Sequence, residues 1–243
     1  MTLKHTLSML ILLVSPITIF AHTSASAEET SREVVLPKAV QDQLDFRKNI
    51  PHTLNDTITD EDKAQSSANY DYVDPTRVIP AKLREAALAY FDLNKQNFAN
   101  QKYLTIVDFS AHSSKSRFFL VDMTTGKVTP FRTSHGKGSD SNNDGYAERF
   151  SNVSGSEASS LGYYRVAETY NGKHGLSIRL DGLSSTNSKA RARAVVVHSA
   201  SYVSEEKKKA GRSWGCFVLD PKYHSSVVSK IKNGSLLYAH LSK

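Results

Sequence analysis

Residues 103–132 read YLTIVDFSAHSSKSRFFLVDMTTGKVTPFR, and this stretch decides the expected fold. Two runs within it, 103–109 and 117–122, are rich in β-branched and aromatic residues and have the length of strands. The segment TTGK at residues 124–127 can turn the chain into a third run at 128–132. The stretch therefore predicts a β-hairpin and the beginning of a β-sheet.

The flanking sequence adds more short strands and few helices. Upstream, Leu83, Ala87 and Phe91 lie at helical spacing within residues 81–91, which predicts an amphipathic helix. Downstream, strand-like runs and one short helix are expected at residues 162–167, 175–180, 194–198, 225–232 (the helix) and 235–240. This pattern predicts a β-rich α+β domain with few short helices, built as a β-sandwich or barrel-like sheet, over residues 80–243.

The amino terminus has the layout of a secretory signal peptide. Lys4 precedes an apolar run at residues 7–20, and the sequence ASA at residues 25–27 provides a small-residue cleavage site. The run is shorter than the ~20 apolar residues that span a membrane, and Pro16 interrupts it. We therefore expect cleavage near Ala27 and an exported product in the periplasm or cell envelope, with no membrane association once the signal peptide is removed.

Residues 28–79 are predicted to be a polar amino-terminal extension and linker. One amphipathic helix candidate lies at residues 37–46, and residues 53–69 have the composition of a linker. Removal of residues 1–27, which contain one lysine and no acidic residue, lowers the formal charge from +7 to +6. A basic exported protein suits an anionic polymer, but its basic residues are scattered, so a nucleic-acid partner is not expected.

The chain contains a single cysteine, Cys216, within the segment GRSWGCFV at residues 211–218. Because no second cysteine can pair with it, the thiol is either an inert buried group or a nucleophile. His198 ends the predicted strand at 194–198 and can serve as the base that activates a thiol. Gly215 leaves room for backbone amides to face an oxyanion. These neighbours favour the nucleophile.

Several further segments around this pair resemble a known family. They lie at residues 134–138, 149–152, 159–162, 170–177, 179–183, 195–200 and 213–216. In this order they resemble the catalytic domain of L,D-transpeptidases, the exported cysteine enzymes that remodel peptidoglycan, in a divergent branch with the motif Ser-Trp-Gly-Cys. The resemblance spans roughly residues 80–240 and implies the β-rich fold of that family.

The resemblance also implies roles for the residues around the thiol. It makes Cys216 the nucleophile and His198 its base, with the backbone carbonyl of Ser199 orienting the imidazole and the amides of Gly215 and Cys216 forming the oxyanion hole. The residues that it implies for substrate binding are Ser213, Trp214, Arg212, His135 and Arg149. It implies neither a metal nor a cofactor.

Two positions depart from the commoner family pattern. That pattern has a glycine after the histidine and an arginine two residues after the cysteine, where this chain has Ser199 and Val218. We expect Arg212 or Arg149 to replace the missing arginine.

The reaction implied by the resemblance is attack of Cys216 on the bond between diaminopimelate and D-alanine in a peptidoglycan tetrapeptide stem. The acyl acceptor stays open among a stem amine, an envelope protein, a D-amino acid and water, and with water the enzyme is an L,D-carboxypeptidase. Two alternatives of another kind are an inactive cell-wall-binding module with the same fold and a cysteine peptidase that acts on protein.

Two loops invite a separate interpretation. Residues 140–145, DSNNDG, match the first half of a calcium-binding loop, but Ser151 occupies the position of its bidentate glutamate, so a polar turn is the preferred prediction. His174 stands in a glycine-flanked loop, where it either lines the cleft or serves only the loop structure.

Overall fold

The computed structural model describes residue 54 and residues 57–243. The predicted signal peptide at residues 1–27 and the helix candidate at 37–46 lie outside the described residues and stay predictions. Within the described part of the chain, every helix is too short or too polar to cross a membrane.

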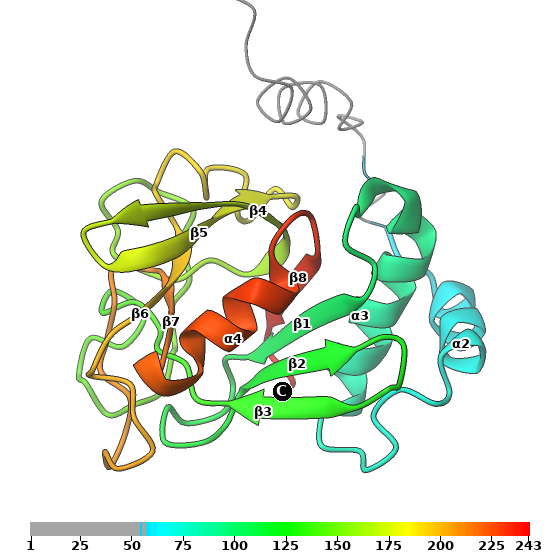
Figure 1. The fold of residues 1–243 in the computed structure, drawn as a ribbon, viewed down its shortest axis with the longest axis horizontal. Helices are drawn as coiled ribbons and strands as arrows, with labels where there is room; N and C mark the ends of the chain where they lie inside the picture. The colour runs from blue at the N-terminus through cyan, green and yellow to red at the C-terminus, as the bar shows by residue number, and fades with distance from the viewer. Residues whose placement is uncertain (1–53, 55–56) are drawn as a thin grey trace, which may run out of the picture. The chain divides into compact units, whose positions relative to one another are not determined.

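One eight-stranded sheet organises the described residues (Figure 1). Its strands are β1 (Tyr103–Asp108), β2 (Phe118–Asp122), β3 (Val128–Phe131), β4 (Gly162–Gly172), β5 (Gly175–Gly182), β6 (Val196–Ser199), β7 (Phe217–Leu219) and β8 (Leu236–His240). They follow the order β3-β2-β1-β8-β4-β5-β6-β7. The pairs β1–β8 and β6–β7 are parallel, and the other neighbours are antiparallel.

The two edges of this sheet approach each other. The segment after β3 meets the segment before β7 in an isolated parallel bridge between Gly136 and Ser213. The Ser213 amide donates to the His135 carbonyl at 2.8 Å, and the Ser134 amide donates to the Val218 carbonyl at 3.3 Å. The sheet is therefore nearly closed and barrel-like, and the β-rich fold with few short helices expected from the sequence is confirmed.

The hairpin predicted from residues 103–132 forms as expected. β1 pairs with β2 and β2 pairs with β3, both antiparallel. Because side chains alternate along a strand, Leu104 and Ile106 enter one apolar cluster while Val107 enters another on the opposite face. Both faces of β1 are thus buried.

Helices cover the two faces of the sheet. The helical elements are α2 (Asp60–Asn69), α3 (Ala81–Asn94), the 3₁₀ turn η1 (Lys95–Asn97) and α4 (Pro221–Ile231). α3 packs against β1 and β8 with Leu83 and Ala87 fully buried, as its predicted stripe requires. α4 packs on the other face through Val227, Val228 and Ile231. Each fully buried side chain of leucine size contributes about 2 kcal/mol to folding.

The linker predicted at residues 53–69 is wrong for residues 60–69, which form α2. Thr59 and Asp62 make a capping box there: the Asp62 amide donates to Thr59 Oγ1 at 3.1 Å, and the Thr59 amide donates to Asp62 Oδ2 at 2.8 Å. α2 contacts α3, and the Tyr70 hydroxyl donates to Asp92 Oδ1 at 2.8 Å. Local capping and this neighbour hold a segment whose composition is polar.

Candidate active site

Two adjacent parallel strands carry the predicted base and nucleophile. His198 lies on β6 opposite Val218 of β7, and Cys216 directly precedes β7. Side-chain alternation puts Val197 and Phe217 into the main apolar cluster, which leaves Cys216, Val218 and His198 on the other face. The sheet register thus brings together two residues that are 18 positions apart in the sequence.

His198 is held as a neutral imidazole. Its Nδ1 lies 3.1 Å from the Ser199 carbonyl oxygen, and because a carbonyl only accepts, this contact puts the hydrogen on Nδ1 and leaves Nε2 with a free lone pair. Burial lowers the pKa of His198, the Ser199 carbonyl opposes that shift, and the charges of His174 and His224 lower it further. Near neutral pH the ring is therefore ready to accept a proton through Nε2.

His174 covers one face of this imidazole. It lies in the tight turn between β4 and β5, exposed to solvent, and its ring stacks on His198 with centroids 4.2 Å apart and an interplanar angle of 22°. Of the two readings of its loop, the structure supports the one in which His174 lines the site. The stack leaves the edge of His198, where the nitrogens lie, as the reactive part of the ring.

The Cys216 thiol is partly exposed and points toward the Ala194 carbonyl, 3.6 Å away. Among residues 57–243, no hydrogen bond joins Cys216 to His198. Hydrogen bonds between catalytic groups are often long or poorly aligned until substrate binds. Burial raises the pKa of the Cys216 thiol, while the backbone amide of Val196 and the positive charge of Arg193 oppose the rise. The thiol alone is therefore a poor nucleophile and depends on these donors and on a base.

A tight turn fixes the segment before the thiol. Gly215 adopts φ +116°, a conformation that side chains other than glycine rarely take. Its amide donates to Ser213 Oγ at 3.1 Å, and that hydroxyl donates to the Cys216 carbonyl at 2.8 Å. The Gly215 amide is thus occupied by Ser213, which does not fit the predicted role as an oxyanion donor in this arrangement.

Arg193 is a neighbour of the thiol that the sequence did not predict. Its guanidinium donates to the carbonyls of Ser151 and Ala158, both at 2.6 Å, and to Ser156 Oγ at 3.2 Å. A Cβ atom on Gly215 would lie 3.4 Å from Arg193 Nη2, so the cation lies beside the turn that carries the thiol. In the sequence, Arg193 belongs to the run ARARA at residues 190–194, which ends one residue short of β6. Nothing in this run distinguishes the second arginine from the first.

The position of the missing family arginine belongs to the core. Val218 is fully buried and packs with Val203 and Ala210 of the β6–β7 loop. Burying an unpaired charge in this apolar cluster would be costly, so an arginine side chain would have to point out of it. Valine instead packs against the loop that covers the strands. Of the two arginines expected to replace it, Arg212 donates to the Asp140 carbonyl and Arg149 donates to the Gly138 carbonyl at 3.3 Å. Arg193, rather than either of them, is the cation whose charge acts on Cys216.

His135, which was predicted to contact the substrate, is buried and has a hydrogen-bond partner on each ring nitrogen. Its Nδ1 accepts from Arg117 Nη2 at 2.8 Å, and its Nε2 donates to Asp140 Oδ2 at 3.0 Å. Burial and the Arg117 charge lower the pKa of His135 to about 4, although Asp140 opposes the shift. The neutral ring links a buried cation to a buried carboxylate, which is a structural role and not the substrate contact that was predicted.

The loop that resembles a calcium site is organised by its own backbone. Asp140 Oδ1 accepts from the Asp144 amide and Oδ2 accepts from the Gly145 amide, both at 3.0 Å. In residues 57–243, no group of three or more histidine, cysteine, aspartate or glutamate side chains is arranged to hold a metal ion. These contacts fit the polar turn.

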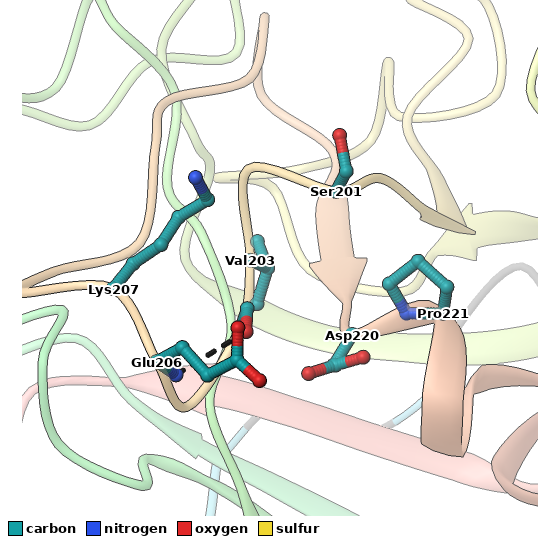
Figure 2. A pocket seen from close by; sticks show the side chains of 7 residues that line it. Ser201, Val203, Glu206, Lys207, Asp220 and Pro221 are labelled. Carbon is teal, nitrogen blue, oxygen red and sulfur yellow. Dashed lines mark hydrogen bonds between the residues drawn. The ribbon is translucent and has the colours of Figure 1, made fainter.

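A pocket of about 470 Å³ flanks the β6–β7 loop, and Figure 2 shows side chains that line it. Ser201, Val203, Ser204, Glu206, Lys207, Asp220 and Pro221 line it. Neither Cys216 nor His198 contributes to its walls. His198 instead lies on β6 and Cys216 directly before β7, and Trp214, two residues before Cys216, is exposed.

Comparison with known proteins identifies similar chains. A sequence profile described as the L,D-transpeptidase catalytic domain matches residues 76–240. Similar solved structures include an L,D-transpeptidase from Mycobacterium smegmatis, with 16% identity and a TM-score of 0.37, covering 57% of this chain and 58% of that one. Others are L,D-transpeptidase 3 from Mycobacterium tuberculosis (12% identity, TM-score 0.38, 57% and 61% covered) and an L,D-transpeptidase from Xylanimonas cellulosilytica (14%, 0.33, 57% and 60%). This chain thus covers less than two thirds of the length of each, and no curated protein sequence matches it.

Proposed function

The chain belongs to the L,D-transpeptidase catalytic domain family, and on this premise we propose that it is an exported peptidoglycan L,D-transpeptidase acting through a Cys216 thioester. The observation that carries the proposal is the placement of His198 and Cys216 on one face of the parallel pair β6–β7, with the His198 ring oriented by the Ser199 carbonyl. This arrangement is that of a base and a thiol nucleophile.

The first half-reaction acylates the thiol. His198 Nε2 takes the proton of Cys216, and the thiolate attacks the carbonyl that links diaminopimelate to the terminal D-alanine of a tetrapeptide stem. The C–N bond then breaks, His198 returns the proton to the leaving amine, and D-alanine departs from a thioester. The charge of Arg193 and the Val196 amide stabilise the thiolate, and we assign the oxyanion to the Cys216 amide.

The second half-reaction releases the acyl group and restores the thiol. An amine from a neighbouring stem attacks the thioester carbonyl, His198 accepts its proton, and the thiolate of Cys216 leaves and is reprotonated. The same steps with water as the acceptor make the enzyme an L,D-carboxypeptidase, and an envelope protein or a D-amino acid can supply the amine instead. Export through the signal peptide predicted at residues 1–27 brings the enzyme to this substrate.

The test is incubation with purified disaccharide-tetrapeptide, followed by mass spectrometry. A crosslinked dimer is the expected product, and a tripeptide identifies the carboxypeptidase. Recovery of unchanged substrate contradicts the proposal and favours an inactive cell-wall-binding module.

The role of Cys216 has its own test. The wild-type protein is expected to form a thioester adduct with a carbapenem, which adds the mass of the drug, and Cys216→Ala is expected to form none. An adduct of the same mass on the alanine variant would show that another group is the nucleophile.

A further inference from the structure

The side chain of Trp214, close to the proposed nucleophile in the sequence, is exposed to solvent. Trp214 leaves 73% of its surface exposed, the largest fraction among the large apolar side chains in the described residues, and stands two residues before Cys216. Burial of a tryptophan stabilises a protein more than burial of most side chains does, so leaving this one uncovered forgoes that gain. An exposed tryptophan next to a nucleophile therefore indicates a ligand that covers it during the reaction.

The backbone beneath this ring is fixed. Ser213 is joined to Gly136 by the isolated bridge, and its hydroxyl is shared between the Gly215 amide and the Cys216 carbonyl. The indole is therefore presented on a rigid turn, which lowers the entropy lost when a ligand stacks on it.

The groups beside the indole select the chemistry of that ligand. Lys137 Nζ lies 5.7 Å from the centroid of the Trp214 ring and forms an ion pair with Glu157 Oε2 at 2.7 Å. Glu157 disfavours an anionic ligand and Lys137 disfavours a cationic one. A neutral polyol suits both, because its hydroxyl groups accept from the ammonium and donate to the carboxylate. The C–H face of a pyranose ring also stacks on the negative face of an indole.

We infer that Trp214, Lys137 and Glu157 form a binding site for a sugar ring, occupied by a pyranose of the peptidoglycan glycan strand. The identity of that occupant rests on the proposed function. Three stem residues separate the glycan from the bond that Cys216 attacks, and they span at most about 10 Å. Trp214 lies two residues from the nucleophile, so one substrate can reach both places.

Kinetics with two substrates test this site. The ratio of kcat/KM for disaccharide-tetrapeptide to kcat/KM for the free tetrapeptide is expected to fall about tenfold in Trp214→Ala, as the loss of one aromatic stack predicts. Trp214→Phe is expected to restore most of the ratio. Leu93→Ala is the matched control: it removes an exposed apolar side chain from α3, away from the Trp214 turn in the sequence, and is expected to keep the wild-type ratio. An unchanged ratio in Trp214→Ala overturns the inference, and an equal fold loss of kcat/KM on both substrates is one way in which that result would arise.

Fluorescence gives a second measurement that needs no turnover. Trp214 is the only tryptophan in the chain, so it reports directly on its own environment. Titration of the wild-type protein with a tetramer of β-1,4-linked N-acetylglucosamine is expected to produce a saturable change in emission, weakened in Lys137→Ala. A response to the free tetrapeptide without a response to the saccharide overturns the inference. If the wild type turns over neither peptide substrate, the proposed function fails, whereas the saccharide titration still decides whether the sugar site exists.

Discussion

Replacement of Gly215 by alanine tests how the turn before Cys216 positions the thiol. Gly215 has φ +116°, and a Cβ atom built on it lies 2.7 Å from the Ala158 carbonyl oxygen. That oxygen belongs to the backbone and accepts from Arg193 Nη2 at 2.6 Å, so it cannot move away without breaking this contact. The alanine must therefore shift the turn that carries the thiol.

Two costs follow from this geometry. The backbone conformation alone costs about 1–3 kcal/mol for a residue with a side chain. Relief of the contact displaces Cys216, and a displacement of about 1 Å at a reacting group costs roughly 100-fold in rate. We expect Gly215→Ala to lose about 100-fold in kcat/KM on disaccharide-tetrapeptide, together with a lower free energy of unfolding in urea.

The variant Gly155→Ala separates the cost of backbone strain from the cost of the contact with Ala158. Gly155 also has a positive φ, +78°, but a Cβ atom there meets no other atom within 4 Å. This variant is expected to lose about 1 kcal/mol of stability and to keep a kcat/KM within about threefold of the wild type. Equal activities of the two variants would refute the argument that contact with Ala158, rather than backbone strain, sets the position of the thiol.

Two further predictions concern titrating groups. Arg193→Gln removes the charge that opposes the raised pKa of Cys216, so the midpoint of iodoacetamide alkylation against pH is expected to move to higher pH; an unchanged midpoint contradicts this role. His135 has a folded pKa of about 4, below its ordinary value near 6.5, so the unfolded chain binds the proton more readily. The stability that its neutral ring confers is complete above pH 6.5 and is lost as the pH falls toward about 4, at up to about 1.4 kcal/mol per unit. The amide of His135→Gln can also accept from Arg117 and donate to Asp140, but it does not titrate. Chemical denaturation across this pH range is therefore expected to show that the free energy of unfolding of His135→Gln depends less steeply on pH than that of the wild type. An identical pH dependence in the two proteins would show that other groups cause it.

Much of the fold could be predicted from local sequence. The hairpin at residues 103–132 and the stripe of α3 depend on the period of the apolar residues, which is visible without the tertiary structure. α2 was missed because its stability depends on the Thr59–Asp62 cap and on contacts with α3, and its composition has no apolar face. β7 was missed because a strand of three residues is too short to show a period and pairs only with distant β6.

The sequence provided candidate residues for the site but not their contacts. His198 and Cys216 could be singled out because their chemistry is rare and specific. The contacts of His135 could not, because a buried histidine linking Arg117 to Asp140 and a histidine lining a cleft look alike in a sequence. The same limit hid Arg193 within an arginine-containing run.

The sequence by itself determined the strand pattern, the single thiol, the candidate base and the resemblance to a family, since each depends on residue type and local spacing. Only the tertiary structure decided which cation lies near Cys216, why Val218 is apolar, and that Ser213 occupies the Gly215 amide. The physical reason is that the cation near Cys216 and the cluster around Val218 depend on contacts between separate segments of the chain, whereas the Ser213–Gly215 hydrogen bond depends on the backbone conformation of the turn. None of these contacts leaves a pattern of residue types in the sequence.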